Sequence, residues 1–193
     1  NFMQLFFGWE GVGLASYLLI GFWFTKESAA SGSLKAFIVN RVGDFGFILG
    51  IAALLDFAGT LDYAPIFAKL SHLSLLHVNL FPGYAAPLLT VVGVCLFIGA
   101  MAKSSQIPLH VWLPESMAGP TPISALIHAA TMVTAGVFMV ARLSPLYNYS
   151  PAALSLILIV GATGALFLGL LAIVENDIKR IIAYSTMSQL GYM

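Results

Sequence analysis

The sequence has very little charge. Only 8% of its 193 residues are Asp, Glu, Lys or Arg, while 60% are hydrophobic. An ordinary soluble domain carries about 25% charged residues, so this composition excludes a soluble globular protein. The eight basic residues are balanced by eight acidic ones, and no basic surplus is left to neutralise the phosphates of a nucleic acid. The composition therefore excludes nucleic acid as a partner and indicates a lipid bilayer.

Cysteine and other metal ligands are scarce as well. Cys95 is the single cysteine, so neither an internal disulfide nor a CxxC metal site can form. The four histidines are scattered along the chain without neighbouring thiols, which makes them a poor set of ligands for zinc. We therefore expect that this chain binds no metal and no redox cofactor.

Long apolar runs dominate the sequence instead. A membrane helix needs about 20 apolar residues to cross a hydrocarbon core of about 30 Å. Because the chain opens inside an apolar run without a methionine and closes in mid-pattern, we interpret it as an internal piece of a longer protein. The runs predict an all-α integral membrane protein, a multi-helix transmembrane bundle with a single membrane domain over 1–193. The predicted helices cover about 2–24, 34–57, 85–107, 123–141 and 151–174, with another starting at 178.

Polar and small residues separate these runs. Residues 25–33 and 59–84 are predicted to be connections, and Ile66–Leu76 in the second could form an amphipathic helix on the membrane surface. The connections after the first and fifth runs hold more basic residues than the others, which places them on the cytoplasmic or matrix side. These basic residues are Lys26, Lys35, Lys179 and Arg180.

Two residue types predict how the helices are placed. Small residues at helical spacing favour close contact between helices, and they occur in the second and fifth runs as Gly46, Gly50, Gly161, Ala165 and Gly169. Tryptophan is enriched at membrane interfaces. Possible interfacial anchors are Trp9, Trp23 and Trp112.

The third run ends in an unusual way. Lys103 is followed by the polar residues Ser104–Gln106 and then by Pro108, which breaks a helix. An interrupted helix at membrane depth is tolerated only where it is buried in protein or lines a watery cavity. The sequence therefore predicts a discontinuous helix near Pro108 and makes Lys103 a candidate carrier of a proton. The alternative is a lysine that extends along its aliphatic stem to the interface.

Three further charges lie inside the first two runs. Glu10 is about eight residues, or about 12 Å, from the start of its run, well inside the hydrocarbon depth. Arg41 and Asp44 are three residues apart and share one helical face, so we expect them to form an ion pair. We also expect Glu10 within salt-bridge distance of Arg41 or a lysine. These charges form either a structural salt bridge or a titratable carboxylate whose proton affinity is set by a nearby cation.

The fourth run carries His128 and follows a proline-rich segment. An imidazole can accept and release a proton near neutral pH, so His128 could pass a proton onward. The alternative is a hydrogen-bonded histidine of the protein core. Residues 114–122, which read PESMAGPTP, predict a rigid turn with a helix starting near Pro122.

At these residues the sequence closely resembles the proton-pumping, antiporter-like subunits of respiratory NADH dehydrogenase. The most specific match covers Lys103 to Val133, which reads KSSQIPLHVWLPESMAGPTPISALIHAATMV. Other matching segments are FFGWEGVGLASYLLIGFWF near the start, NRVGDFGF around Arg41 and Asp44, and NDIKRIIAYSTMSQLGYM at the end.

The resemblance implies the antiporter-like subunit fold, built from five-helix repeats inserted in opposite orientations, each with one discontinuous helix. It implies that Glu10 is the glutamate of an ion pair, that Lys103 is the lysine on the broken helix and that His128 is a relay histidine. Arg41 and Asp44 match the segment that tunes the pair. The family's usual acidic residue before GPTP is replaced here by Ala118, and the nearby acid is Glu115.

The resemblance also implies a function. We expect a proton-translocating membrane subunit of NADH:quinone oxidoreductase, which couples electron transfer from NADH to quinone with proton pumping. The parent complex uses NADH, FMN, iron-sulfur clusters and quinone, none of them bound by this chain, and the partners are its other membrane subunits. The wording of the motifs favours a bacterial inner membrane over a mitochondrial one. The alternatives are the large subunit of a multi-subunit sodium/proton antiporter and a structural scaffold with static ion pairs.

Overall fold

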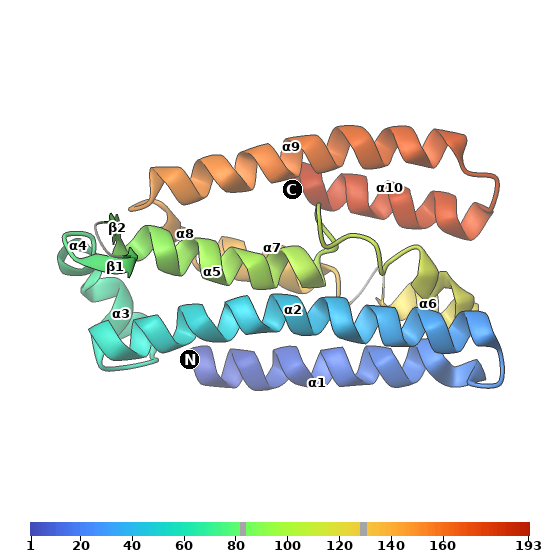
Figure 1. Cartoon of the computed structure of the whole chain (residues 1–193), viewed down its shortest axis with the longest axis horizontal. Coiled ribbons are helices and arrows are strands. Elements are labelled where there is room, and N and C mark those ends of the chain that lie inside the picture. Colours follow the sequence, from blue (N-terminus) through green and yellow to red (C-terminus); the bar gives the residue numbers. More distant parts are fainter. Residues whose placement is uncertain (82–83, 128–130) are drawn as a thin grey trace.

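The computed structural model describes residues 1–81, 84–127 and 131–193, and most of these residues are helical. Long helices run side by side along one axis, and short elements lie both at the ends of the bundle and beside its middle (Figure 1). Among the described residues, three helical segments are long and apolar enough to cross a membrane: Phe2–Trp23, Glu27–Ala58 and Pro151–Val174. The predicted helical transmembrane bundle is confirmed, with fewer uninterrupted spans than the five expected.

The first two helices form an antiparallel pair. Helix α1 (Phe2–Ile20) begins with a capping box, in which Asn1 Oδ1 accepts a hydrogen bond from the backbone N–H of Gln4, and it continues into the 3-10 turn η1 (Gly21–Trp23). Helix α2 (Glu27–Ala58) begins earlier than expected, so the predicted loop over 25–33 was wrong for residues 27–33. The small residues of this stretch serve helix packing instead, because a Cβ added to Gly32 would lie 2.7 Å from the carbonyl oxygen of Glu115.

Short elements connect α2 to the third long element. They are α3 (Tyr63–Ala68), α4 (Leu70–Leu73) and an antiparallel hairpin of β1 (His77–Phe81) and β2 (Tyr84–Pro87). The predicted helix over 66–76 is therefore not continuous, because its residues fall in two short helices that meet at Lys69 and end at Leu73. The chain turns at Lys69, whose Nζ donates a hydrogen bond to the carbonyl of Ala58 near the end of α2 (2.9 Å).

Helix α5 (Leu88–Lys103) lies against α2 in the centre of the bundle (Figure 1). It begins later than the expected residue 85, because 84–87 form a strand. A Cβ added at Gly46 would lie 2.7 Å from Ile98 Cγ2, and one added at Gly50 would lie 2.9 Å from Leu96 Cδ2. The close helix contact that the sequence predicted at these two glycines is therefore confirmed.

The chain is irregular after α5, as the prediction of a discontinuous helix required. The helix ends at Lys103, four residues before the expected end, and Ser105 has a φ of 52°. The irregular stretch leads to η2 (Glu115–Ala118) and then to α6 (Thr121–Ala125).

The predicted span over 123–141 is not one helix, because α6 ends at Ala125 and α7 covers Thr134–Arg142. Residues 131–133 lie outside any helix, and there the Thr131 hydroxyl donates to the carbonyl of Leu126 (3.1 Å). Helix α8 (Ser144–Tyr147) follows.

The last two helices form a second antiparallel pair (Figure 1). Helix α9 (Pro151–Val174) has the predicted bounds, and α10 (Ile178–Tyr192) begins where the sixth helix was expected. They touch at glycines, since a Cβ added to Gly161 would lie 2.6 Å from the carbonyl oxygen of Gly191. The predicted packing role of Gly161 is confirmed.

Candidate functional site

Helices α1, α2 and α5 bring four charged side chains into two ion pairs. Glu10 of α1 pairs with Arg41 of α2, and Asp44 of α2 pairs with Lys103 at the end of α5. Because Arg41 and Asp44 lie three residues apart on one helix, the two pairs are neighbours. Negative and positive side chains therefore alternate in the order Glu10, Arg41, Asp44 and Lys103.

The pair of Asp44 and Lys103 is the buried one. Lys103 Nζ lies 3.5 Å from Asp44 Oδ2, and the two side chains are 1% and 5% exposed. Lys103 is the last residue of α5, where the free carbonyls of a helix end favour a cation. The lysine side chain thus turns into the bundle toward Asp44 instead of extending to an interface.

The pair of Glu10 and Arg41 lies nearer the surface of the bundle. Their side chains are 22% and 42% exposed, and the guanidinium of Arg41 also lies over the ring of Phe37, 4.8 Å from its centroid. The predicted pairing of Glu10 is confirmed.

The expected pair between Arg41 and Asp44 was wrong, because each takes a partner from another helix. Helix α5 comes into contact with α2 at Gly43, the residue before Asp44, where Ala102 packs against the glycine. This contact brings Lys103 to Asp44 and leaves Arg41 to Glu10. Arg41 is still close enough to act electrostatically on both Asp44 and Lys103.

Several polar atoms around the buried pair lack hydrogen-bond partners among the described residues. They are Lys103 Nζ, Asp44 Oδ1, Trp9 Nε1 and Asn40 Oδ1. Buried polar groups are nearly always hydrogen-bonded, to protein or to ordered water. The pair therefore shares its buried surroundings with two further polar side chains, Trp9 of α1 and Asn40, one helical turn before Asp44.

Trp9 is a site residue that the sequence analysis misplaced. It was expected at a membrane interface, but it is only 3% exposed and packs on Phe47 with ring centroids 4.8 Å apart. The sequence held a signal for this placement, because Trp9 is next to Glu10 and must lie at nearly the same depth in the membrane as that carboxylate.

The break after Lys103 is held by side chains that bind free backbone carbonyls. Trp112 Nε1 donates to the carbonyl of Ala102 (2.9 Å), and Ser104 Oγ donates to the carbonyl of Val133 (2.6 Å). Trp112 is fully buried, so the expectation of an interfacial anchor was wrong here too. These bonds fix the end of α5 and hence the place from which Lys103 extends.

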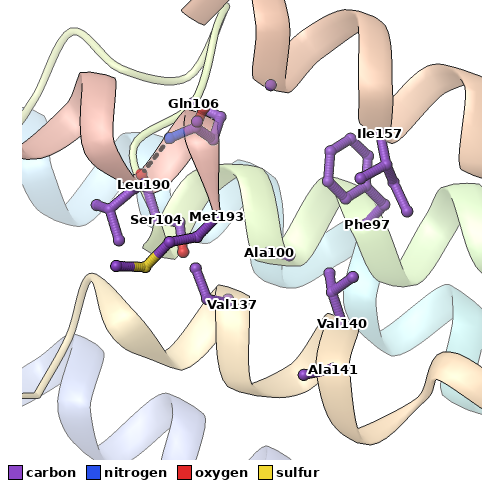
Figure 2. A pocket seen from close by; sticks show the side chains of 13 residues that line it. Phe97, Ala100, Ser104, Gln106, Val137, Val140, Ala141, Ile157, Leu190 and Met193 are labelled. Atoms are coloured by element: carbon purple, nitrogen blue, oxygen red, sulfur yellow. Dashed lines mark hydrogen bonds between the residues drawn. The ribbon is translucent and has the colours of Figure 1, made fainter. Parts of the chain in front are cut away.

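A cavity of about 160 Å³ lies beside the break, between α5, α7, α9 and α10. Figure 2 shows Ser104 and Gln106 as its polar side chains among apolar ones such as Val137 and Leu190. The amide nitrogen of Gln106 donates to the carbonyls of Ser104 (3.1 Å) and Met187 (3.3 Å), whereas its oxygen has no partner among the described residues. Gln106, which lines this cavity, therefore carries a hydrogen-bond acceptor three residues beyond Lys103 in the chain.

A second hollow of about 270 Å³ reaches Lys103 itself, from the side of α1 and α7. Its lining is formed by Gln4, Leu5, Gly8, Trp9, Val12, Lys103, Ala135 and Phe138. Lys103 therefore lies between Asp44 of α2 and an apolar groove that is lined by α1 and α7.

The remaining predicted residues lie apart from these pairs or outside the description. His128 lies outside the described residues, so its relay role stays a prediction. Glu115 forms an ion pair with Lys35 near the start of α2. Lys179 donates to the carbonyl of Gly119 (3.3 Å), so basic residues at this end of the bundle hold the proline-rich turn. Within the described ranges no group of three or more His, Cys, Asp or Glu residues could hold a metal ion.

Known proteins resemble the whole chain. A family model described as NADH:quinone oxidoreductase/Mrp antiporter, TM, matches residues 1–193. The NADH-quinone oxidoreductase subunit L of Neisseria meningitidis serogroup A is 62% identical over 194 residues, covering 100% of this chain and 29% of the relative. The NADH-ubiquinone oxidoreductase chain 5 of Marchantia polymorpha is 58% identical over 194 residues, with the same two coverages. The chain thus spans about three-tenths of the length of these curated relatives.

Two solved structures share the fold. A chain of the Mrp complex from a Dietzia species superposes with a TM-score of 0.86 at 29% identity, covering 100% of this chain and 20% of that one. A chain of the membrane-bound sulfane sulfur reductase, an archaeal respiratory membrane complex, gives a TM-score of 0.79 at 26% identity, covering 99% and 37%. The fold is therefore the predicted antiporter-like one.

Proposed function

The chain belongs to the NADH:quinone oxidoreductase/Mrp antiporter family of integral membrane proteins, and on this premise we propose that it is a proton-translocating part of NADH:quinone oxidoreductase. In this role residues 1–193 belong to a single membrane domain, whose partners are the other membrane subunits of the complex, in a bacterial inner membrane. The 62% identity to a subunit L supports this assignment. NADH, FMN, iron-sulfur clusters and quinone belong to the parent complex, and this chain contributes charged side chains to proton movement.

The pair of Asp44 and Lys103 carries the proposal. Proton transfer at membrane depth requires a group that gains and loses charge inside the protein, and a buried charge there is costly unless it is paired. Among the described residues, the ammonium of Lys103 has one counter-charge in reach, Asp44 Oδ2 at 3.5 Å. A lysine can release its proton, whereas an arginine remains protonated at any accessible pH. Lys103 is therefore the proton carrier.

Arg41 controls this pair through its choice of partner. While its guanidinium is held by Glu10, Asp44 is free to stabilise the ammonium of Lys103. If the guanidinium turns to Asp44, three residues away on α2, the ammonium loses its counter-charge and its proton can leave. A charge rearrangement driven by electron transfer elsewhere in the complex would determine whether Arg41 pairs with Glu10 or with Asp44. His128 then receives the proton, as the family resemblance implies.

The test uses two substitutions of Lys103 in the full-length subunit of the assembled complex. Lys103→Ala removes the carrier, so we expect NADH-driven proton pumping in sealed vesicles, normalised to assembled complex, to fall at least about tenfold. Lys103→Arg keeps the charge and should not restore pumping, because the guanidinium does not release its proton. Near-normal pumping in both variants would contradict the proposal and leave Lys103 as a structural charge.

A second candidate is the large subunit of a sodium/proton antiporter. The observation that favours it is the TM-score of 0.86 with a chain of an Mrp complex. The identity of 29% to that chain is much lower than the 62% to subunit L, which supports the first candidate. Proton movement that requires a sodium gradient and does not change when NADH is added would favour the antiporter.

A further inference from the structure

Gly13 of α1 lies directly against the amine of Lys103. A Cβ built on Gly13 would be 2.7 Å from Lys103 Nζ, closer than real Cβ atoms come to other atoms. Apart from the atoms next to it in its own helix, Lys103 Nζ is the one atom of the described residues within 4 Å of that position. The space that the missing side chain leaves is therefore filled by the amine alone.

The backbone of Gly13 does not explain this closeness. Its carbonyl already accepts a hydrogen bond from Ser16 Oγ (2.8 Å), and Lys103 Nζ has no hydrogen-bond partner among the described residues. Gly13 is also an ordinary helical residue inside α1, where glycine costs about 1 kcal/mol relative to alanine. A glycine here weakens the helix, and the benefit it provides is room for the amine.

We infer that Gly13 is a positioning residue for Lys103, because its missing side chain leaves the room in which the amine moves between Asp44 and the groove between α1 and α7. The inference rests on the proposed function of Lys103. An alanine at residue 13 requires the amine to move by about 0.7 Å to reach an ordinary contact distance of 3.4 Å. The amine is the end of a flexible side chain, so the fold accommodates this shift. The shift changes the geometry of the Asp44–Lys103 pair, and displacements of this size are enough to slow proton transfer.

The experiment compares Gly13→Ala with Gly11→Ala in the full-length subunit of the assembled complex. Gly11 lies two residues away on the same helix, is exposed, and has nothing within 4 Å of its built Cβ, so both substitutions give α1 the same gain in helix propensity. We expect Gly13→Ala to lower NADH-driven pumping per assembled complex by about threefold or more. Gly11→Ala should pump like the unchanged protein, and the amount of assembled complex should be equal in both.

A second pair of variants separates positioning from helix packing. Lys103→Met keeps an unbranched side chain of similar length and removes the nitrogen that a Cβ at residue 13 would meet. If Gly13 serves the amine, adding Gly13→Ala to Lys103→Met should not lower the thermal stability of the complex. Equal loss of stability from Gly13→Ala with either residue at 103 would show a packing role and overturn the inference.

The two proposals fail in different ways. If Lys103→Ala pumps poorly but Gly13→Ala pumps like Gly11→Ala, the inference about Gly13 is overturned and the function of Lys103 stands. If Lys103→Ala pumps normally, the proposed function fails and the inference about Gly13 fails with it.

Discussion

Arg41 and Asp44 lie three residues apart on α2, yet each forms its ion pair with a different helix, Arg41 with Glu10 and Asp44 with Lys103. Neighbouring charges of opposite sign on a helix can also pair with each other. The two residues thus have two possible pairings, one across helices and one within α2. A membrane protein that moves protons by rearranging charge needs such a choice.

The first prediction concerns the counter-charge of Lys103. Asp44→Asn keeps the shape of the side chain and removes its charge, which leaves the ammonium buried without a partner. Breaking a buried pair in this way costs about 3–5 kcal/mol, so we expect a lower melting temperature of the complex and a strong loss of pumping. Asp56→Asn is the matched control, because Asp56 is exposed on the same helix.

The double variant Asp44→Asn/Lys103→Met removes both charges. It should be more stable than Asp44→Asn alone, since no unpaired charge remains, and it should still fail to pump. Thermal unfolding of the purified complex measures this difference. If the double variant were less stable than Asp44→Asn alone, the lysine would be neutral or paired with another group.

The second prediction concerns competition for Asp44. Glu10→Gln releases the guanidinium of Arg41, which then turns to Asp44 and displaces Lys103. We expect a loss of pumping from this single change. Glu10→Gln/Arg41→Gln removes the competitor but also the guanidinium that releases the proton of Lys103, so pumping should stay as low as in Glu10→Gln. A double variant that pumps less than either single variant would mean that the two residues contribute independently.

Much of the bundle follows from the sequence because membrane helices are set by local composition. The bounds of α9 and the start of α10 could be predicted from an apolar run, a proline at its first residue and the charges that follow it. The early start of α2 could not, because the small polar residues of 27–33 look like a loop until the packing of Gly32 against Glu115 is known. Contacts between distant segments decide such cases.

The same distinction applies to the site. The depth of Glu10 and the break after Lys103 are local features, so both could be predicted from spacing. The pairing of Asp44 with Lys103 joins residues 59 positions apart, and it depends on how α5 packs on α2 at Gly43. Local spacing favoured Arg41 as the partner of Asp44 and gave no sign of Gly13.

The third prediction concerns the end of α5. Trp112 Nε1 donates to the carbonyl of Ala102, the residue before Lys103, and the indole is fully buried. Trp112→Phe keeps an aromatic ring and leaves this carbonyl without its donor, which costs about 1–3 kcal/mol for a buried group. We expect a lower melting temperature of the complex and weaker pumping, because the end of α5 fixes the position of Lys103. Trp23→Phe is the matched control, since Trp23 is 38% exposed and contacts Lys26 through its ring face. Equal stability of the two variants would show that the bond of Trp112 does not hold the break.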